Sequence, residues 1–341
     1  MLAVKVRKDG AEKVKKYLAR QKLMDINYKL ISANEFIYFP IWRADTENRL
    51  FLSNQKAKIV DMEFARNPAK SDYREKLMKS LGDEYDDAVK SYDVVGDIAL
   101  IDAQDMKVAK KTAAVIMGLN RNVKTVLSKS GAVSGRYRIR KYRYVAGEKR
   151  YETIYNENGA SFKIDVRKSF FSTRLAFERN RISQLVRDGE SVAVMFAGIG
   201  PFAIEIAKKH KKAKVLAIEL NKDAYKYMLE NVQLNKTTNV EACIGDVKRI
   251  APKYAGFADR IIMPLPKSSH EFLGAVAKMA KGRCVVHYYA FGNSKSAFED
   301  NAALLRKFFK KNGRKMRVLS KRIVRTYSAN EIEVVLDILI Y

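Results

Sequence analysis

Short apolar runs and stretches with helical spacing alternate along the chain, and the most informative set lies between residues 191 and 221. Residues 191–195 form an apolar run that ends before two glycines, and residues 201–207 then have helical spacing. A second apolar run, residues 215–218, ends on Glu219. A buried strand that turns through glycines into a helix is typical of a doubly wound α/β sheet. We therefore predict a nucleoside site at the carboxyl edge of this sheet, between Gly198 and Glu219.

The flanking patterns predict two smaller α+β regions before this sheet and an antiparallel ending after it. Residues 1–65 contain a strand, a helix with Val14 and Leu18 on one face, and an alternating run, and the polar segment 65–71 is interpreted as a linker. A strand is predicted over 92–101, and Asn158-Gly159 predicts a hairpin turn. Two final strands, near 315–324 and 331–341, have no helix between them. The predicted domains are residues 1–70, 71–166 and 167–341.

The glycine stretch suits two classes of ligand. Gly198 and Gly200 permit backbone angles that a side chain would forbid, and Glu219 is placed to accept hydrogen bonds from ribose hydroxyls. Asp246, at the end of the next strand, would accept from the amino group of an adenine. A nicotinamide dinucleotide and S-adenosylmethionine both satisfy this pattern. We favour the methyl donor because the rest of the chain points to RNA.

The charge of the chain points to a polyanionic partner. Its 66 Lys plus Arg residues exceed its 38 Asp plus Glu residues, which gives a formal net charge of +28. Such an excess attracts nucleic acid over long distances. No apolar run approaches the roughly 20 residues that span a bilayer, and the N-terminus does not resemble a signal peptide. The two cysteines, Cys243 and Cys284, lack metal-ligand spacing, so we expect a cytoplasmic protein without a bound metal.

One basic stretch, residues 134–145, interleaves arginines with aromatic residues. In an extended strand, Arg136, Arg138 and Arg140 share one face. Arginine donates to phosphates and base edges, and aromatic rings stack on unpaired bases, so this stretch predicts an RNA contact. Further along, Arg174 and Glu178 lie four residues apart in a predicted helix just before the nucleoside-binding strand, which suggests that one or both face the site.

Several motifs in order resemble one family, the archaeal and eukaryotic tRNA (guanine-37-N1)-methyltransferases. The resemblance covers about residues 70–341 well and the first module more loosely. The matching motifs are Thr153-Ile-Tyr-Asn-Glu-Asn-Gly, Phe162-Lys-Ile-Asp-Val, Phe171-Ser-Thr-Arg-Leu, Met195-Phe-Ala-Gly-Ile-Gly-Pro-Phe and Met263-Pro-Leu-Pro-Lys. It implies an α/β class I S-adenosylmethionine-dependent methyltransferase fold, a Rossmann-like doubly wound sheet with an antiparallel terminal strand, preceded by α+β RNA-binding domains. A monomer that binds the anticodon loop of tRNA is expected.

The resemblance also assigns roles to residues. Glu178 would be the general base for the guanine N1 proton, and Arg138 would donate to O6 as charge develops there. With Pro264 these are the predicted catalytic residues. The predicted cofactor-binding residues are Arg174, Phe196, Ala197, Gly198, Gly200, Pro201, Glu219, Asp246 and Pro264. The predicted substrate-binding residues are Arg136, Arg138, Phe170, Arg174, Pro266 and Lys267.

Three positions depart from the family pattern: Thr173 replaces a proline, Val194 an acidic residue, and Pro264 an asparagine. Proline at the last position is similar to an archaeal subgroup that makes N1-methylguanosine and also methylates carbon 7 of 4-demethylwyosine, a wyosine precursor. We therefore expect methylation of the base at tRNA position 37 with both products. Three alternatives stay open: transfer of the aminocarboxypropyl group of the same cofactor, a tRNA-binding protein without catalysis, and a nicotinamide-dependent oxidoreductase.

Overall fold

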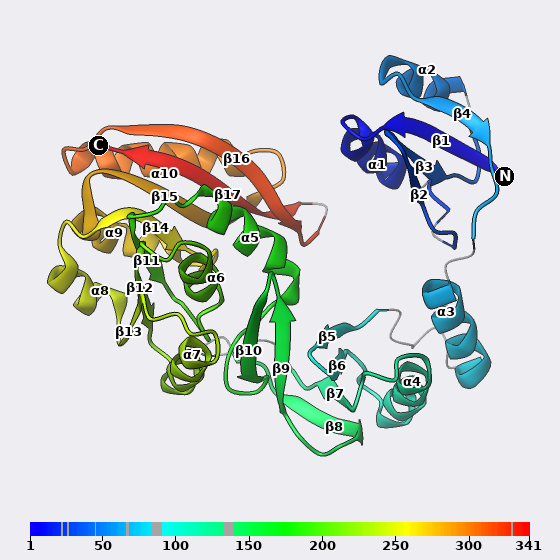
Figure 1. Cartoon of the computed structure of the whole chain (residues 1–341), viewed down its shortest axis with the longest axis horizontal. Coiled ribbons are helices and arrows are strands. Elements are labelled where there is room, and N and C mark those ends of the chain that lie inside the picture. Colours follow the sequence, from blue (N-terminus) through cyan, green and yellow to red (C-terminus); the bar gives the residue numbers. More distant parts are fainter. Residues whose placement is uncertain are drawn as a thin grey trace. The chain divides into compact units, whose positions relative to one another are not determined.

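The computed structural model describes residues 1–341 except 22, 26, 45, 66–67, 83–90, 132–134, 136–138 and 329. The chain folds as two compact units. The first contains Met1–Lys90 with Asp105–Arg121, and the second contains Ser91–Gln104 with Asn122–Tyr341 (Figure 1). The three-domain division expected from the sequence stays a prediction.

The first unit begins with a small antiparallel sheet of order β2-β3-β1-β4. Its elements are β1 (Leu2–Arg7), α1 (Ala11–Arg20), β2 (Ile31–Ala33), β3 (Phe36–Pro40), α2 (Thr46–Asn54), β4 (Lys58–Asp61), α3 (Pro68–Leu81) and α4 (Met106–Leu119). Val14 and Leu18 of α1 are fully buried with Val4 and Phe39, as their spacing predicts. The predicted linker is too long, because α3 already begins at Pro68. Proline is favoured in the first turn of a helix, where no N–H donor is needed.

The second unit opens with a sheet of order β5-β6-β7-β8 and a two-stranded hairpin. Its elements are β5 (Asp93–Val95), β6 (Ile98–Ile101), β7 (Thr125–Lys129), β8 (Tyr142–Gly147), β9 (Glu152–Glu157) and β10 (Ala160–Asp165). The strand predicted over 92–101 is in fact two strands, because the chain turns at Gly96 with φ +59°. The hairpin is confirmed: Asn158 and Gly159 both have positive φ between β9 and β10. Among the described residues of the basic stretch, those from Tyr142 onward belong to a named strand, β8.

The rest of this unit is built on a seven-stranded sheet of order β13-β12-β11-β14-β15-β17-β16. Its strands are β11 (Ser191–Met195), β12 (Lys214–Glu219), β13 (Val240–Ile244), β14 (Ala258–Met263), β15 (Ala280–Asn293), β16 (Met316–Thr326) and β17 (Glu331–Ile340). Strands β11 to β15 are parallel, and β17 lies antiparallel between β15 and β16, which confirms the predicted ending. The strand order reverses beside β11, so the carboxyl ends of β11 and β14 frame a crevice.

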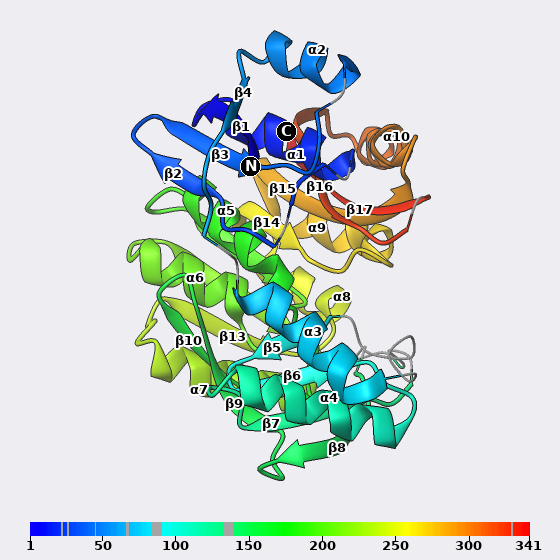
Figure 2. The same ribbon diagram turned by 90° about the vertical axis from the view of Figure 1, so that its right-hand side faces the viewer.

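Helices cover both faces of this sheet (Figure 2). They are the 3₁₀ turn η2 (Thr173–Leu175), α5 (Ala176–Leu185), α6 (Pro201–Lys209), α7 (Lys222–Leu234), α8 (Val247–Ile250), η3 (Ala251–Tyr254), η4 (Ser269–Phe272), α9 (Leu273–Met279) and α10 (Ala297–Lys311). One apolar core joins α5, α6 and α7 to one face, and a second joins α8, α9 and α10 to the other. Burial on both faces explains why residues 191–195 read as a continuous apolar run.

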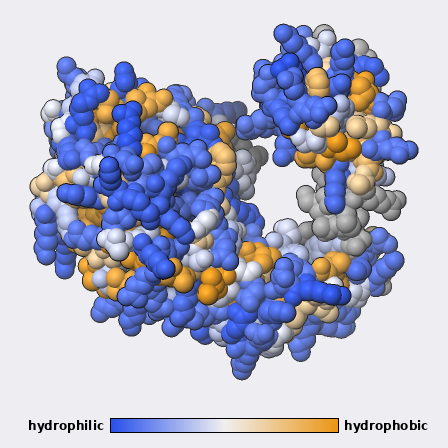
Figure 3. Space-filling view, in the orientation of Figure 1, coloured by the Kyte–Doolittle hydropathy of each residue, from blue (hydrophilic) through white to orange (hydrophobic). Residues whose placement is uncertain are grey.

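The surface seen in Figure 3 is mostly hydrophilic, with scattered apolar spots. No helix within the described ranges has both the length and the apolar composition that a membrane span requires.

Candidate active site

The turn after β11 is shaped by three residues with left-handed backbone. Phe196, Gly198 and Gly200 have φ of +56°, +58° and +91°. Gly200 caps α6, whose first residue is Pro201, and a Cβ at Gly200 would lie 3.0 Å from the Met228 side chain. The loop Phe196–Gly200 can therefore follow this path only with glycine at its tightest point. Ala197, Gly200 and Pro201 shape the turn but do not line the cavity described next.

Glu219, at the end of β12, lies beside this turn and is hydrogen-bonded to it. Its two carboxylate oxygens accept hydrogen bonds from the backbone N–H groups of Gly198 and Asn221, each at 2.7 Å. Burial raises the pKa of Glu219, and the hydrogen bonds from the backbone oppose that shift. The carboxylate is thus fixed beside the glycine turn, with lone pairs left for a ligand hydroxyl.

A cavity of about 560 Å³ lies across the carboxyl ends of the parallel strands. Eight predicted site residues line it: Phe170, Phe196, Gly198, Glu219, Asp246, Pro264, Pro266 and Lys267. Asp246 caps α8 by accepting from the backbone N–H of Lys248 at 2.9 Å. The volume is typical of sites for small ligands. The glycine turn, the Glu219 carboxylate beside it and the cavity together fit S-adenosylmethionine. The residues present therefore suit this cofactor.

A second cavity of about 340 Å³ shares one wall with the first, formed by Phe170, Ser172, Arg325 and Tyr327. Among the described residues, four cationic ones line it: Lys129, Arg140, Arg174 and Arg325. The guanidinium of Arg174 donates two hydrogen bonds to Asp93, at 2.8 and 3.0 Å. Arg174 therefore lies in the second cavity and does not line the first. Its predicted role toward cofactor or substrate stays a prediction.

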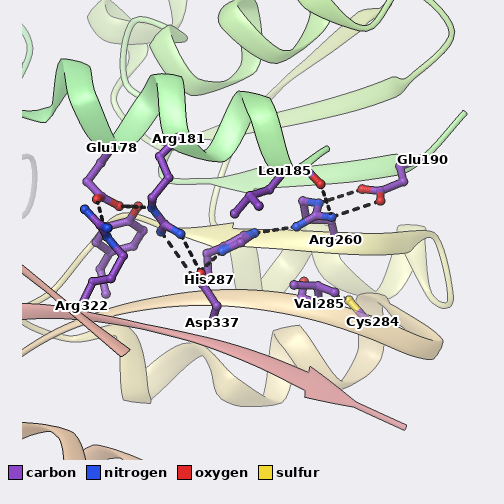
Figure 4. A network of polar contacts seen from close by, with 11 residues as sticks. Glu178, Arg181, Leu185, Glu190, Arg260, Cys284, Val285, His287, Arg322 and Asp337 are labelled. Carbon is purple, nitrogen blue, oxygen red and sulfur yellow. Dashed lines mark hydrogen bonds and ion pairs between the residues drawn. The ribbon is translucent and has the colours of Figure 1, made fainter. Parts of the chain in front are cut away.

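Glu178, the predicted base, belongs to a buried polar network (Figure 4) that meets the cavity at Tyr289. Its Oε2 accepts from Arg181 Nε at 2.9 Å and from the Tyr289 hydroxyl at 3.1 Å, and its Oε1 lies 3.4 Å from Arg322 Nε. Tyr289 lines the cavity, whereas Glu178 does not. Burial and the negative charge of Glu178 raise the pKa of Tyr289.

The network continues from Arg181 through Asp337 to His287 and Arg260. Asp337 accepts from Arg181 and from His287 Nδ1, both at 2.6 Å, and Arg260 donates to His287 Nε2 at 2.8 Å. An arginine can only donate, so Nε2 of His287 must accept and Nδ1 carries the proton. Burial lowers the pKa of His287, which is therefore neutral. Although burial opposes ionisation, the hydrogen bond from His287 and the pairing with Arg181 hold the pKa of Asp337 below its usual range.

Arg136 and Arg138 lie outside the described residues, so their predicted contacts with RNA and with guanine O6 stay predictions. The structure adds Tyr289, Arg325, Tyr327 and Glu333 to the cavity wall, all from β15 or the β16–β17 hairpin. Arg325 stacks over the Tyr327 ring at 4.4 Å, and Tyr327 packs edge-on against Phe291. Sequence reasoning missed them because the terminal strands carry no glycine motif. Only their predicted pairing at the sheet edge could have drawn attention to them.

Three family models match successive parts of the chain: the tRNA methyltransferase 5 N-terminal domain over residues 3–47, the TYW2 N-terminal domain over 73–150, and the TRM5/TYW2 methyltransferase domain over 153–319. The tRNA (guanine(37)-N(1))-methyltransferase Trm5b of Pyrococcus abyssi is 35% identical over 347 residues, which cover 98% of each chain.

Two further comparisons point to the same group of tRNA-modifying enzymes. The tRNA (guanine(37)-N(1))/4-demethylwyosine(37)-methyltransferase Taw22 of Nanoarchaeum equitans is 31% identical over 260 residues, covering 60% of this chain and 85% of that one. The solved complex of aTrm5 with tRNALeu contains a chain that superposes with a TM-score of 0.69 at 31% identity, covering 100% of both chains. The glycine turn, the Glu219 carboxylate and the cavity beside them agree with these likenesses. Because the likeness spans the full length of the chain, this chain belongs to the TRM5/TYW2 methyltransferase family.

Proposed function

We propose that this chain methylates the base at position 37 of tRNA, giving N1-methylguanosine, and that it also methylates carbon 7 of 4-demethylwyosine. The observation that carries the proposal is one continuous cavity with two chemically different ends. The end near β13 has the glycine turn, Glu219 and Asp246. The end near β17 has Tyr289, which is hydrogen-bonded to Glu178.

The first end suits the cofactor. Bound S-adenosylmethionine supplies an electrophilic methyl group on a sulfonium. Glu219 would accept from the ribose hydroxyls while remaining fixed by the backbone of Gly198 and Asn221. Phe196, packed edge-on against Phe272 with ring centroids 4.7 Å apart, would give an apolar wall for the adenine.

The second end suits a base turned out of the anticodon loop, which costs a few kcal/mol of stacking. Phe170 is 49% exposed and lies in the wall between the two cavities, where a base can stack. The cations of the second cavity would hold the flanking phosphates. Guanine N1 carries a proton at neutral pH, so its attack on the methyl group needs a base, and we assign that role to Glu178, a buried carboxylate hydrogen-bonded to Tyr289 of the first cavity.

Pro264 favours the second product. It lines the cavity directly after β14, in a tight turn where the Leu265 N–H donates to Met263 O at 2.9 Å. A proline here offers a ring and backbone carbonyls in place of a side-chain amide. Position 264 therefore offers no side-chain amide to the guanine edge, which suits a bulkier tricyclic base.

Two tRNAs, identical except for guanosine or 4-demethylwyosine at position 37, test the proposal. Each is incubated with the purified protein and S-adenosylmethionine, and its nucleosides are analysed by mass. We expect a gain of one methyl group at position 37 in both. A gain of an aminocarboxypropyl group would replace methyl transfer as the reaction, and unchanged nucleosides would refute the function.

A further inference from the structure

Tyr289 links the active-site cavity to Glu178, because it lines the cavity and its hydroxyl is hydrogen-bonded to the carboxylate. Tyr289 is 1% exposed, and it lines the cavity from β15. Its Oη donates to Glu178 Oε2 at 3.1 Å. Glu178 is 4% exposed and is not among the described residues that line the cavity. Glu178 is therefore connected to the cavity wall through the Tyr289 hydroxyl.

The other described partners of Glu178 cannot carry that proton. They are the guanidinium groups of Arg181 and Arg322, which stay protonated in proteins and have no acceptor atom. A tyrosine hydroxyl both donates and accepts. Of the three described contacts, only the one through Tyr289 can pass a proton from the cavity to the carboxylate.

The network of Figure 4 holds this pair in one geometry. Arg181 is shared between Glu178 and Asp337, and Asp337 is fixed in turn by the protonated Nδ1 of His287. Arg260 fixes the other ring nitrogen of His287 while donating to Glu190 at 2.7 and 3.1 Å. Buried groups that satisfy one another in this way hold their side-chain orientations tightly. Glu178 is thereby kept pointing at the Tyr289 hydroxyl.

We propose that Tyr289 relays the N1 proton of the target guanine to Glu178 during methyl transfer, an inference that rests on the proposed function. In this step N1 of the base forms a bond to the methyl carbon, and the carbon–sulfur bond breaks with its electron pair remaining on sulfur. The N1 proton passes to Tyr289 Oη, and the hydroxyl proton passes to Glu178 Oε2. Tyrosine ends neutral, the carboxylate becomes a carboxylic acid, and no other reactant is needed.

Tyr289→Phe tests the relay, because it removes only the hydroxyl. Tyr288→Phe is a matched control: Tyr288 is the preceding residue of β15, is 2% exposed, and packs in the core on the opposite face of the sheet. Under single-turnover conditions with guanosine-37 tRNA, Tyr289→Phe should slow methyl transfer by roughly 10- to 100-fold, the lower range for losing a proton-transfer group. The rate of methyl transfer by Tyr288→Phe should stay within about twofold of the wild-type rate, which is smaller than the loss expected for a proton-transfer group.

Two measurements without turnover separate this from a structural defect. Calorimetric affinity for S-adenosylhomocysteine and the thermal unfolding midpoint should match between Tyr289→Phe and Tyr288→Phe. Equal losses of rate in the two variants would overturn the relay, as would a Tyr289→Phe enzyme as fast as the wild type. Failure of the wild type to methylate guanosine-37 would instead reject the proposed function, so the two failures are distinct.

Glu178→Gln and the double variant supply the second test. Groups that serve one proton transfer do not contribute independently, so the double variant should be no slower than the slower single variant. A relay also moves two protons in one step, so heavy water should slow the wild type more than Glu178→Gln. Multiplicative losses in the double variant, or an undiminished heavy-water effect in Glu178→Gln, would show that Tyr289 and Glu178 act separately.

Discussion

Glu205 of α6 should make the stability of this enzyme fall between acid and neutral pH. Its carboxyl is buried with Glu157 around a single guanidinium, that of Arg179. Burial, and then the negative charge of Glu157, raise the pKa of Glu205 to about 8, against an ordinary value of 4.5. Between these two values the folded chain holds one more proton than the unfolded chain. The free energy of unfolding therefore decreases as pH rises through this range.

The substitution Glu205→Gln should abolish this loss. An amide is neutral at every pH, can still accept from Asn158 Nδ2, which lies 2.9 Å from Glu205 Oε2, and has an N–H group that could donate to the neighbouring Glu157. Each pH unit inside the window corresponds to about 1.4 kcal/mol for one proton. From pH 5 to pH 7 the wild type should thus lose about 2 to 3 kcal/mol relative to the variant.

Guanidinium chloride unfolding at pH 5, 6 and 7 measures the effect, with Glu230→Gln as the control. Glu230 is a half-exposed carboxylate on α7 that pairs with Lys163 at 2.9 Å, and its removal should leave the pH slope of the wild type in place. Parallel slopes for the wild type and Glu205→Gln would refute the reasoning, because they would show that Glu205 is ionised in the folded chain.

Three further changes have defined outcomes. Gly200→Ala forces a left-handed residue against Met228 and should lower the free energy of unfolding by about 1 to 3 kcal/mol, read by denaturant titration. Glu219→Gln turns an N–H₂ group toward one of two backbone donors and should weaken S-adenosylhomocysteine binding at least tenfold by calorimetry; unchanged affinity would remove Glu219 from the cofactor site. Asp337→Asn removes one of the two buried carboxylates that pair with Arg181 and should cost about 3 kcal/mol at pH 7, the low end for breaking a buried pair, because Glu178 still balances the guanidinium. That deficit should shrink in acid, where wild-type Asp337 itself takes up a proton as pH falls through its depressed pKa.

The parts of the site that local pattern could predict are the glycine turn and the acid that follows it. Gly198, Gly200 and Glu219 lie within one β–α–β unit, and adjacent parallel strands bring their carboxyl ends together. The Asn158-Gly159 hairpin was predictable for the same reason, since a two-residue turn with positive φ is encoded by the residues that form it.

Local sequence patterns could not predict the contacts of Glu178 and its network. Glu178 meets Tyr289 from 111 residues away, and Arg181 meets Asp337 across 156 residues. Alternation along a strand tells which face a side chain occupies, but it does not tell which strand lies next to it. Tyr288 and Tyr289 are equally buried aromatic neighbours on opposite faces of β15, and the packing of α5 against one face decides which one reaches Glu178.

Strand β16, the outermost described strand on its side of the large sheet, has consequences for solubility. It is 11 residues long, and a border of that length invites a strand from another molecule to add to it. Arg317 and Lys321 stand exposed along it, interleaved with the exposed apolar side chains of Leu319 and Ile323. Adding a foreign strand would bring another chain against these cations and strip water from them. The two cations therefore oppose strand addition at an edge where Leu319 and Ile323 would otherwise favour it.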